Sequence, residues 1–377
     1  MPAPSFHIGL FLYNLSVGGA ERSTLLLAKA LVEAGHRVTL FVYRNRFDLV
    51  DELDSRVQLV KGASPALLRR YALLGVPLRQ LRRWRQVDVL VATCRDTLAI
   101  ASMYRRLHGR PVVAWVHYHM TSQPRPTATW VDRIAQATYA QAQWLVAVSE
   151  QGRLAAIEKT GIATERTSTI YNATVIQEGS GHSVVAIKVK AIRQARPGVR
   201  IGLTLGRLHP VKRTDRALHA LAHARSAGHN VELVIAGVGS EMEDLQHLAL
   251  SLGLENAAHF VGLESNVSAA FRSVDFFVMS SMSEGLPLAI IEALHYRCPI
   301  LATDCPSGLR ELLADGRFGR LCPNSTEGLR QGLVDFLENS PPPVAPDDLS
   351  AHLGQFEPQR IARQWTELFG RLLDTRP

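Results

Sequence analysis

Short apolar runs alternate with segments of helical periodicity along this chain, and the alternation occurs twice. In the first half, six runs have the continuous apolar character of buried parallel strands: residues 7–13, 37–43, 57–60, 87–92, 111–117 and 144–148. After a glycine- and serine-containing stretch at 177–183, the alternation restarts with runs at 200–205, 231–236, 258–261, 274–279 and 299–303. Strands that alternate with helices form parallel sheets covered by helices, so the sequence predicts two similar doubly wound α/β domains with a crevice between them.

The length agrees with two domains, because 377 residues exceed what one hydrophobic core usually organises. We place the first domain at 1–175 and the second at 176–356. Prolines at 341–343 break the second pattern. A final helix is expected within 357–377, and it has an apolar face formed by Ile361, Trp365, Leu368, Phe369 and Leu372. That face can dock in any apolar groove, so periodicity alone leaves its position open.

Composition excludes several classes of protein. Charged residues make up 20% and hydrophobic residues 46% of the chain, which describes an ordinary globular protein. No run of about 18 apolar residues occurs, so we expect no membrane span. The apolar start at 6–13 lacks the basic leader of a signal peptide and predicts the first strand. The four cysteines (Cys94, Cys298, Cys305 and Cys322) include no C-x-x-C pair, and we expect a reduced, cytosolic chain.

The sequence contains no recognisable cofactor motif. No set of His, Cys and carboxylate residues has metal-ligand spacing, and no D-x-D follows a strand. The glycines after the first strand do not form the G-x-G-x-x-G dinucleotide fingerprint. We therefore expect neither a metal nor a nicotinamide cofactor.

Positive charge is concentrated in the first half. Residues 1–175 hold 22 Lys and Arg against 12 Asp and Glu, whereas residues 176–377 hold 20 against 22. A basic amphipathic segment with an aromatic residue can bind an anionic membrane surface, and one such candidate consists of Arg79, Arg82, Arg83, Trp84 and Arg85. The alternative is a solvated basic helix whose apolar stripe packs on its own core. No RNA-binding signature appears, so nucleic acid is not an expected partner.

The most informative stretch follows the strand at 274–279 and ends in the next helix. A small polar cluster with Glu284 and Gly285 ends the strand, and Pro287 suits the first turn of that helix. Glu292 lies eight residues after Glu284, so both carboxylates can face the carboxyl end of the strand, where open α/β sheets bind ligands. Carboxylates there accept hydrogen bonds from sugar or ribose hydroxyls. The alternative is an exposed loop residue and a solvated helix position.

Two cations follow the strand at 200–205. Gly206 ends that strand, and Arg207 and Lys212 precede a helix expected to begin near residue 214. An arginine fork and a lysine charge beside a helix N-terminus can bind a diphosphate and neutralise charge on a leaving group. The alternative is that both are unpaired surface cations. Gly237, in a G-x-G turn after the next strand, allows another close approach of backbone to ligand.

Three further turns stand at strand ends. Gly18 and Gly19 follow the first strand, where backbone amides at a helix N-terminus can approach a ligand. His117 closes the fifth strand and either hydrogen-bonds a substrate hydroxyl or is a structural histidine satisfied there. Ser307 and Gly308 can offer a hydroxyl and amides to a phosphate at a helix start.

In combination, these motifs resemble glycosyltransferase family 4. The resemblance rests on G-G-A-E-R at 18–22, G-R-x4-K at 206–212, G-x-G at 237–239 and, above all, E-G-L-P-L-A-x2-E-A at 284–293. T-D-C-P-S-G-x-R-E-L at 303–312 is similar to bacterial members that build lipopolysaccharide, capsule or lipid-linked oligosaccharides. The motifs cover most of the chain in the family's order. Ala173 departs from the pattern, since glycine or proline often follows the preceding asparagine.

The resemblance implies a GT-B architecture: two Rossmann-like domains, an acceptor-binding first and a nucleotide-sugar-binding second, with the last helix crossing back to the first. By the same resemblance, Arg207 and Lys212 would hold the donor diphosphate, Glu292 the ribose and Glu284 the transferred sugar. His117 would contact that sugar near the reaction centre. The implied catalytic group is therefore His117, Arg207, Lys212 and Glu284. The implied donor site consists of Gly18, Gly19, Gly206, Arg207, Lys212, Gly237, Glu284, Gly285, Leu286, Pro287 and Glu292.

We therefore predict a retaining, metal-independent glycosyltransferase. It would move a sugar from a nucleotide-diphosphate donor, with a UDP-sugar favoured, to a glycan or lipid-linked acceptor at the inner face of the cytoplasmic membrane. The family retains anomeric configuration without a clear protein nucleophile, and none is evident in this sequence. Two alternatives stay open: a nucleotide-sugar epimerase of the same architecture, which needs no acceptor, and a catalytically silent nucleotide-sugar-binding protein.

Overall fold

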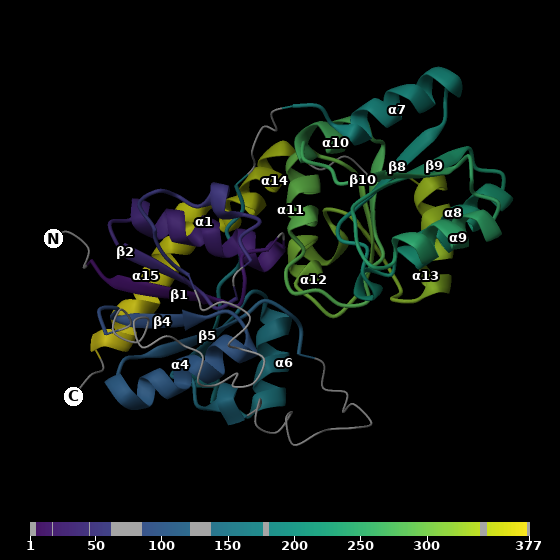
Figure 1. Ribbon diagram of the computed structural model, residues 1–377. Coiled ribbons are helices and arrows are strands. Elements are labelled where there is room, and N and C mark those ends of the chain that lie inside the picture. Colours follow the sequence, from purple (N-terminus) through teal and green to yellow (C-terminus); the bar gives the residue numbers. More distant parts are fainter. Residues whose placement is uncertain are drawn as a thin grey trace. The chain divides into compact units, whose positions relative to one another are not determined.

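The computed structural model describes residues 5–16, 18–44, 46–61, 85–120, 137–175, 181–339 and 345–374. The chain divides into two compact units (Figure 1). Unit 1 comprises Met1–Val175 together with Gln355–Pro377, and unit 2 comprises Ile176–Gly354.

The described strands of unit 1 form one seven-stranded parallel sheet in the order β3-β2-β1-β4-β5-β6-β7. Their bounds are β1 His7–Leu12, β2 Arg37–Val42, β3 Gln58–Lys61, β4 Val89–Ala92, β5 Val112–Val116, β6 Trp144–Ala147 and β7 Thr167–Thr169. The first six overlap the predicted apolar runs, and all but β3 are largely buried, whereas β3 exposes Gln58 and Lys61. β7 was not predicted, because a three-residue strand of threonine and serine carries no apolar signal.

The described helices of unit 1 are α1 Gly19–Glu33, α4 Arg95–His108, α6 Glu150–Thr160 and α15 Pro358–Asp374, with 3-10 turns η1 Val50–Glu52, η2 Thr164–Arg166 and, at the boundary with unit 2, η5 Gly354–Phe356. Their ends follow familiar sequence signals. Ser149 caps α6 by accepting a hydrogen bond from the backbone of Gly152, and Gly161 ends that helix in the left-handed conformation.

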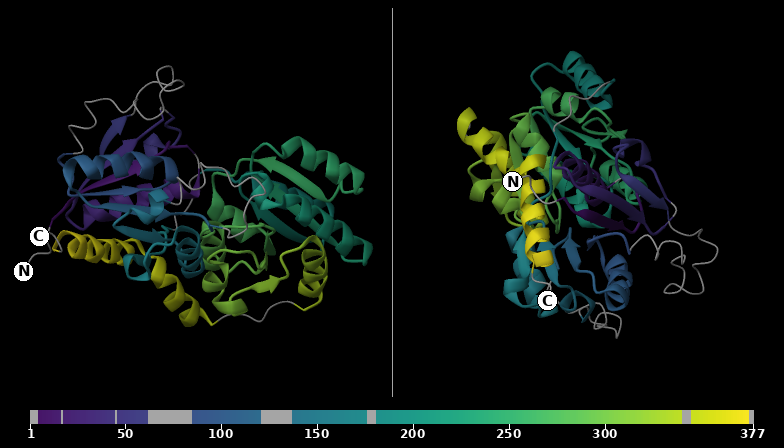
Figure 2. Two further views of the ribbon diagram at one scale, coloured as in Figure 1. Left: turned by 90° about the horizontal axis from the view of Figure 1, so that it is seen from below. Right: turned by 90° about the vertical axis from the view of Figure 1, so that its left-hand side faces the viewer.

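The final helix, α15, returns to unit 1 and lies against α1 (Figure 2). Its apolar face is buried, and the Trp365 ring meets the Trp115 ring of β5 edge to face with 5.2 Å between centroids. His36 Nε2 and Thr366 Oγ1 are 2.8 Å apart at the same contact. The expectation that the last helix crosses back to the first domain is confirmed.

The described strands of unit 2 form a six-stranded parallel sheet in the order β10-β9-β8-β11-β12-β13. Their bounds are β8 Arg200–Leu205, β9 Val231–Ala236, β10 Ala258–Gly262, β11 Phe276–Met279, β12 Ile300–Thr303 and β13 Arg320–Cys322. The helices are α7 Val184–Ala195, α8 Thr214–Ser226, α9 Met242–Ser251, α10 Val267–Ser273, α11 Leu288–His295, α12 Leu309–Leu312, α13 Thr326–Glu338 and α14 Pro346–Leu353, with 3-10 turns η3 Pro210–Lys212 and η4 Ala314–Gly316.

Both sheets therefore have the strand order 3-2-1-4-5-6 of a doubly wound fold, extended in unit 1 by β7. The predicted fold of two Rossmann-like α/β domains is confirmed. No described helix has both the length and the apolar character that crossing a membrane would require.

Candidate active site

The strand order of unit 2 reverses between β8 and β11, and a pocket opens at that point. In open α/β sheets, ligands bind at the carboxyl ends of the strands where the order reverses. The pocket joins the turn after β8, the start of α8, the end of β11 and the start of α11. It is lined by Thr204, Leu205, Gly206, Arg207, Lys212, Thr214, Phe277, Val278, Met279, Ser280, Ser281, Pro287, Leu288 and Ala289.

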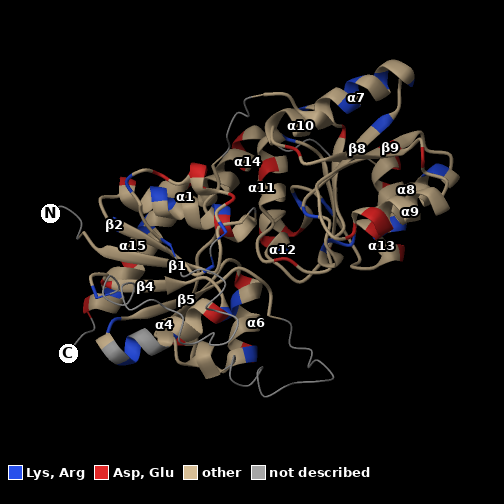
Figure 3. Ribbon diagram, in the orientation of Figure 1, with Lys and Arg blue, Asp and Glu red and all other residues tan. Residues whose placement is uncertain are grey.

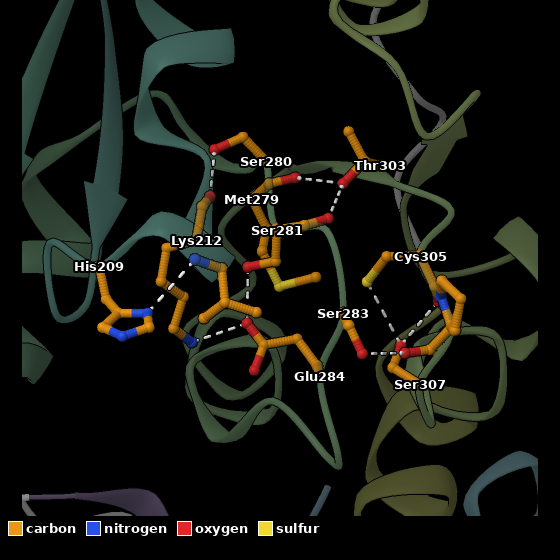
Figure 4. A network of polar contacts seen from close by, with 12 residues as sticks. His209, Lys212, Met279, Ser280, Ser281, Ser283, Glu284, Thr303, Cys305 and Ser307 are labelled. Carbon is orange, nitrogen blue, oxygen red and sulfur yellow. Dashed lines mark hydrogen bonds and ion pairs between the residues drawn. The ribbon is translucent and has the colours of Figure 1, made fainter. Parts of the chain in front are cut away.

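An ion pair connects the two motifs that the sequence singled out. Lys212 Nζ lies 2.7 Å from Glu284 Oε1, although the residues are 72 positions apart in the chain (Figure 4). The side chain of Glu284 is only 13% exposed and that of Lys212 31%, so water screens this pair less than a surface pair. Lys212 is therefore not an unpaired surface cation, and Glu284 is not an exposed loop residue.

Backbone hydrogen bonds hold the loop between β11 and α11, residues 280–287, in place. Met282 donates its amide to the carbonyl of Val211 at 2.8 Å, and Gly308 donates to the carbonyl of Gly285 at 2.8 Å. These bonds tie the loop to the turn before α8 on one side and to the start of α12 on the other. The position of Glu284, which lies within this loop, is therefore set by tertiary contacts.

Three buried hydroxyl groups support the ion pair, and the sequence reasoning missed their roles. Ser280 Oγ donates to the carbonyl oxygen of Lys212 at 2.9 Å, and Ser281 Oγ donates to Glu284 Oε1 at 2.6 Å. Thr303 Oγ1, at the end of the neighbouring strand, donates to the carbonyl of Ser281 at 2.8 Å. The signal was present, since hydroxyl residues directly follow β11 and end β12, but no local rule assigns them partners.

Two glycines bring the turns after β8 and β9 into contact. Gly206 and Gly237 have φ values of +150° and +151°, which L side chains rarely adopt. A Cβ on Gly237 would lie 1.8 Å from the carbonyl oxygen of Gly206. Gly237 is buried and packs on the turn that carries Arg207, so the contact shown here is with the protein backbone.

Arg207 differs from Lys212 in that it is exposed. It lines the same pocket and makes no hydrogen bond or ion pair within the described part of the chain. Its guanidinium group is therefore available to bind an anion in the pocket.

The remaining residues of the predicted donor motif follow Glu284 into α11. Leu286 is buried, and Pro287 occupies the N-cap position of α11, immediately before the first turn in which the sequence predicted it. Glu292 lies on α11, is half-buried and does not line the pocket. The structure thus brings Gly206, Arg207, Lys212, Glu284 and Pro287 together.

A thiol lies close to this loop, but it is a poor nucleophile. Cys305 is 3% exposed, and burial raises its pKa to about 11. A protonated thiol does not attack carbon efficiently at neutral pH. This agrees with the absence of an evident nucleophile in the sequence.

His117 and the glycine pair belong to unit 1. Both ring nitrogens of His117 are buried and lack a hydrogen-bond partner within the described residues. Burial lowers the pKa of His117 to about 3, and its ring lies 4.1 Å from that of Trp115 between centroids. Gly18 is the N-cap of α1 with φ −172°, extended backbone that any residue adopts, and Gly19 begins the helix. The roles of these three residues stay predictions.

The candidate membrane-surface segment lies mostly outside the described residues. Arg79, Arg82, Arg83 and Trp84 fall in the range 62–84, which the structure does not describe. Arg85 is described and exposed. On the described helices of both units, basic and acidic positions are interspersed (Figure 3).

Two family descriptions match this chain, one in each half. Residues 17–178 match the description "Glycosyltransferase Family 4", and residues 188–354 match "Glycosyl transferases group 1". The two matches follow each other in the order of the two units and together span most of the sequence.

Known proteins of similar length give the same result. The chain is 26% identical to an uncharacterized glycosyltransferase of Haemophilus influenzae, covering 89% of this chain and 91% of that protein. It is 24% identical to the N-acetylgalactosamine-N,N'-diacetylbacillosaminyl-diphospho-undecaprenol 4-alpha-N-acetylgalactosaminyltransferase of Campylobacter jejuni, covering 88% of this chain and 90% of that protein.

Solved structures agree on the fold. The crystal structure of Anabaena Alr3699/HepE in complex with UDP and glucose superposes with a TM-score of 0.80 at 20% identity, covering 97% of this chain and 100% of that one. Matches to both halves, full-length relatives and this shared architecture lead to one conclusion. The chain is a glycosyltransferase that belongs to glycosyltransferase family 4 and has the GT-B fold.

Proposed function

We propose that this enzyme is a retaining, metal-independent glycosyltransferase that transfers a sugar from a UDP-sugar to a glycan or lipid-linked acceptor at the inner face of the cytoplasmic membrane. The observation that carries the proposal is the pocket at the switch point of unit 2, which Arg207 and Lys212 line, together with the ion pair that joins Lys212 to Glu284. Two cations suit a diphosphate, and the carboxylate suits sugar hydroxyls.

In this proposal Arg207 and Lys212 bind the donor diphosphate. In the free protein, the ammonium group of Lys212 pairs with the carboxylate of Glu284. When the donor binds, its phosphates replace that carboxylate as the anionic partner of Lys212. When the bond between the anomeric carbon and the phosphate oxygen breaks, its electron pair leaves with the diphosphate. Positive charge beside that oxygen stabilises the transition state.

The acceptor oxygen bonds to the same face of the anomeric carbon, and its proton passes to the leaving phosphate oxygen. No protein nucleophile is needed, which fits the protonated thiol of Cys305. Glu284 accepts hydrogen bonds from the transferred sugar, and Glu292 accepts them from the ribose. In unit 1, His117 is assigned to the donor sugar, and Gly18 and Gly19 to the phosphates.

The similarity to enzymes with known partners supports the choice of donor and acceptor. The Anabaena protein was crystallised with UDP, and the Campylobacter relative acts on a diphospho-undecaprenol acceptor. A lipid-linked acceptor requires access to a membrane surface, and the basic segment with Arg79, Arg82, Arg83, Trp84 and Arg85 is suited to provide it.

A thermal-shift screen across UDP-, GDP-, ADP- and dTDP-sugars tests the donor. Ligand that binds only the native state raises the melting temperature by mass action, so we expect the largest shift with a UDP-sugar. Charge removal by Arg207→Ala should reduce that shift, whereas Lys190→Ala, an exposed cation on α7, should leave it unchanged. A larger shift with another base would reassign the donor, and no shift with any of them would refute the proposal.

Sedimentation with vesicles containing anionic lipid tests the membrane surface. Reversing the charge of Arg79, Arg82, Arg83 and Arg85 should weaken binding by about 1 kcal/mol per basic residue removed. If this variant sediments with the vesicles as the wild type does, the basic segment does not contribute to membrane binding.

A further inference from the structure

Two consecutive buried serines form hydrogen bonds with the two residues of the ion pair in unit 2, Lys212 and Glu284. Ser280 and Ser281 are 2% and 1% exposed, and they directly follow β11. The hydroxyl of Ser280 bonds to the backbone of Lys212, whereas that of Ser281 bonds to the side chain of Glu284 (Figure 4). Each serine therefore forms a hydrogen bond with one member of the pair, and of the two only Ser281 bonds to a charged group.

We propose that Ser281 is a positioning residue for Glu284: it holds the carboxylate so that the second oxygen, Oε2, faces the hydroxyls of the transferred sugar. This role rests on the proposed function of Glu284 as the sugar contact. Oε1 is occupied twice, by Lys212 Nζ at 2.7 Å and by Ser281 Oγ at 2.6 Å. Within the described part of the chain Oε2 has no hydrogen-bond partner, and it is turned away from the serine (Figure 4).

Lys212 alone is not suited to hold Glu284 during the reaction. Its ammonium is a compact charge on a flexible stem of four carbons, and the donor diphosphate competes for it. The Ser281 hydroxyl sits on a short buried side chain, carries no charge and is not attracted to phosphate to the same degree. When the donor draws Lys212 away, Ser281 is the partner that keeps Oε1 in place.

Thr303 fixes the serine in turn. It is fully buried at the end of β12, and its hydroxyl donates to the carbonyl oxygen of Ser281 at 2.8 Å. The same hydroxyl lies 3.5 Å from the carbonyl of Met279. Thr303, the last residue of β12, thus anchors the loop that follows β11. The chain of contacts runs from Thr303 through Ser281 to Glu284.

The variant Ser281→Ala tests this role, with UDP and the UDP-sugar selected by the thermal-shift screen as probes. Calorimetry measures the Kd of each, and the kcat for UDP release measures the chemical step without an identified acceptor. We expect the Kd of UDP to stay within about twofold, because UDP has no transferred sugar. The kcat with the UDP-sugar should fall on the order of tenfold, as expected for loss of a hydrogen bond to a charged group.

Two further variants separate positioning from general structural damage. Ser281→Thr keeps the hydroxyl and should restore most of the kcat. Thr303→Val keeps the shape of a buried side chain and removes only its hydroxyl, so it should lower kcat in the same sense but less, even if Ser281→Ala fails to fold.

Ser268→Ala is the matched control. Ser268 is 4% exposed, lies on α10 of the same unit and donates to Asn266 Oδ1 at 2.9 Å, so its loss removes a comparable buried hydrogen bond away from the pocket. We expect unchanged kcat in this variant.

Three results would overturn the role of Ser281: unchanged kcat in Ser281→Ala or, if that variant does not fold, in Thr303→Val; equal weakening of UDP and UDP-sugar binding; or an equal loss in Ser268→Ala. A wild-type protein that binds neither UDP nor any UDP-sugar would instead overturn the proposed function, and this role with it. The two failures are distinguishable because only the second affects the wild type.

Discussion

The two units share a strand order but differ where the fourth strand meets its helix. In unit 1, β4 ends at Ala92 and α4 begins at Arg95, so two residues make the connection. In unit 2, β11 ends at Met279 and α11 begins at Leu288, so the connection has eight residues. Both connections lie at the carboxyl edge beside the first strand of their sheet, where ligands of such folds bind.

The short connection is satisfied by a local capping box and by one neighbouring strand, since Thr93 donates its amide and its hydroxyl to the carbonyl of Phe11. Cys94 and Thr97 form a capping box at the start of α4, within three residues of each other. The long connection has no such local solution and is held by groups from other parts of unit 2, among them Val211, Thr303 and Gly308. In unit 2 the longer loop carries Glu284, and contacts with other parts of the unit fix that loop.

One group of polar side chains in each unit shows a second contrast. In unit 2, Lys212, Ser281 and Glu284 satisfy one another. In unit 1, the nitrogens of Trp115, His117 and Trp365 are buried without hydrogen-bond partners in the described residues. Unit 2 therefore holds a pre-arranged charged pair, whereas these nitrogens of unit 1 belong to a cluster of aromatic rings, in which Trp115 contacts both His117 and Trp365.

The largest expected effect concerns α15, the C-terminal helix, which belongs to unit 1. Trp365→Ala empties a fully buried indole site and should lower the free energy of unfolding by about 3–5 kcal/mol. Hydrogen exchange resolved by residue should show the loss in unit 1, while amides of unit 2 keep their protection. Leu154→Ala, an exposed leucine of unit 1, is the control. Equal loss in both units would mean that they do not unfold separately.

The next effect is on catalysis in unit 2. Lys212→Ala removes charge beside the leaving group and should lower kcat by about 10²–10³-fold, or roughly 2.7–4 kcal/mol, as for loss of one oxyanion donor. The matched control is Lys190→Ala, which removes an exposed lysine of the same unit. If turnover is unchanged, Lys212 has no part in the mechanism, and the contrast between the two units loses its functional meaning.

A glycine substitution tests whether turn contacts position the site. Gly237→Ala places a Cβ against the carbonyl of Gly206 and adopts positive φ, so it should cost about 1–3 kcal/mol and weaken UDP binding. Gly228→Ala also adopts positive φ, at +93°, but meets no atom within 4 Å. It should cost less and leave UDP binding intact; equal effects of the two would rule out the contact as the cause.

The last expected effect is a pH dependence in unit 1, which is modest for any single pH unit. Burial lowers the pKa of His117 to about 3, below the value of about 6.5 in the unfolded chain, so the unfolded state binds more protons between these values. The stability contribution is complete above about pH 6.5 and is lost as pH falls toward 3, by at most about 1.4 kcal/mol per pH unit. Urea unfolding measured across this pH range should give a free energy of unfolding that depends less steeply on pH in His117→Gln than in the wild type. Equal pH dependence in the two proteins would contradict the low pKa of His117.

Much of the fold was predictable from periodicity, because a buried strand must be apolar over its length. β8 and β9 begin and end at the predicted residues, and the helix predicted to begin near residue 214 begins at Thr214. Two short strands, β7 and β13, were missed, since three residues carry too little apolar signal. The sequence analysis named Gly206, Arg207, Lys212, Glu284 and Pro287, which the structure brings together, because glycines, cations and carboxylates at strand ends stand out. It did not assign the supporting hydroxyls of Ser280, Ser281 and Thr303.

The amino-acid sequence by itself determined the two α/β units, the residues that stand at the carboxyl ends of their strands, and the family. The tertiary structure alone decided that Lys212 meets Glu284, that Ser281 and Thr303 support that carboxylate, and that α15 packs on α1. The physical reason is that strand and helix patterns record local burial, one residue at a time. A hydrogen bond between side chains 72 positions apart depends on how loops from different strands pack, which no local pattern encodes.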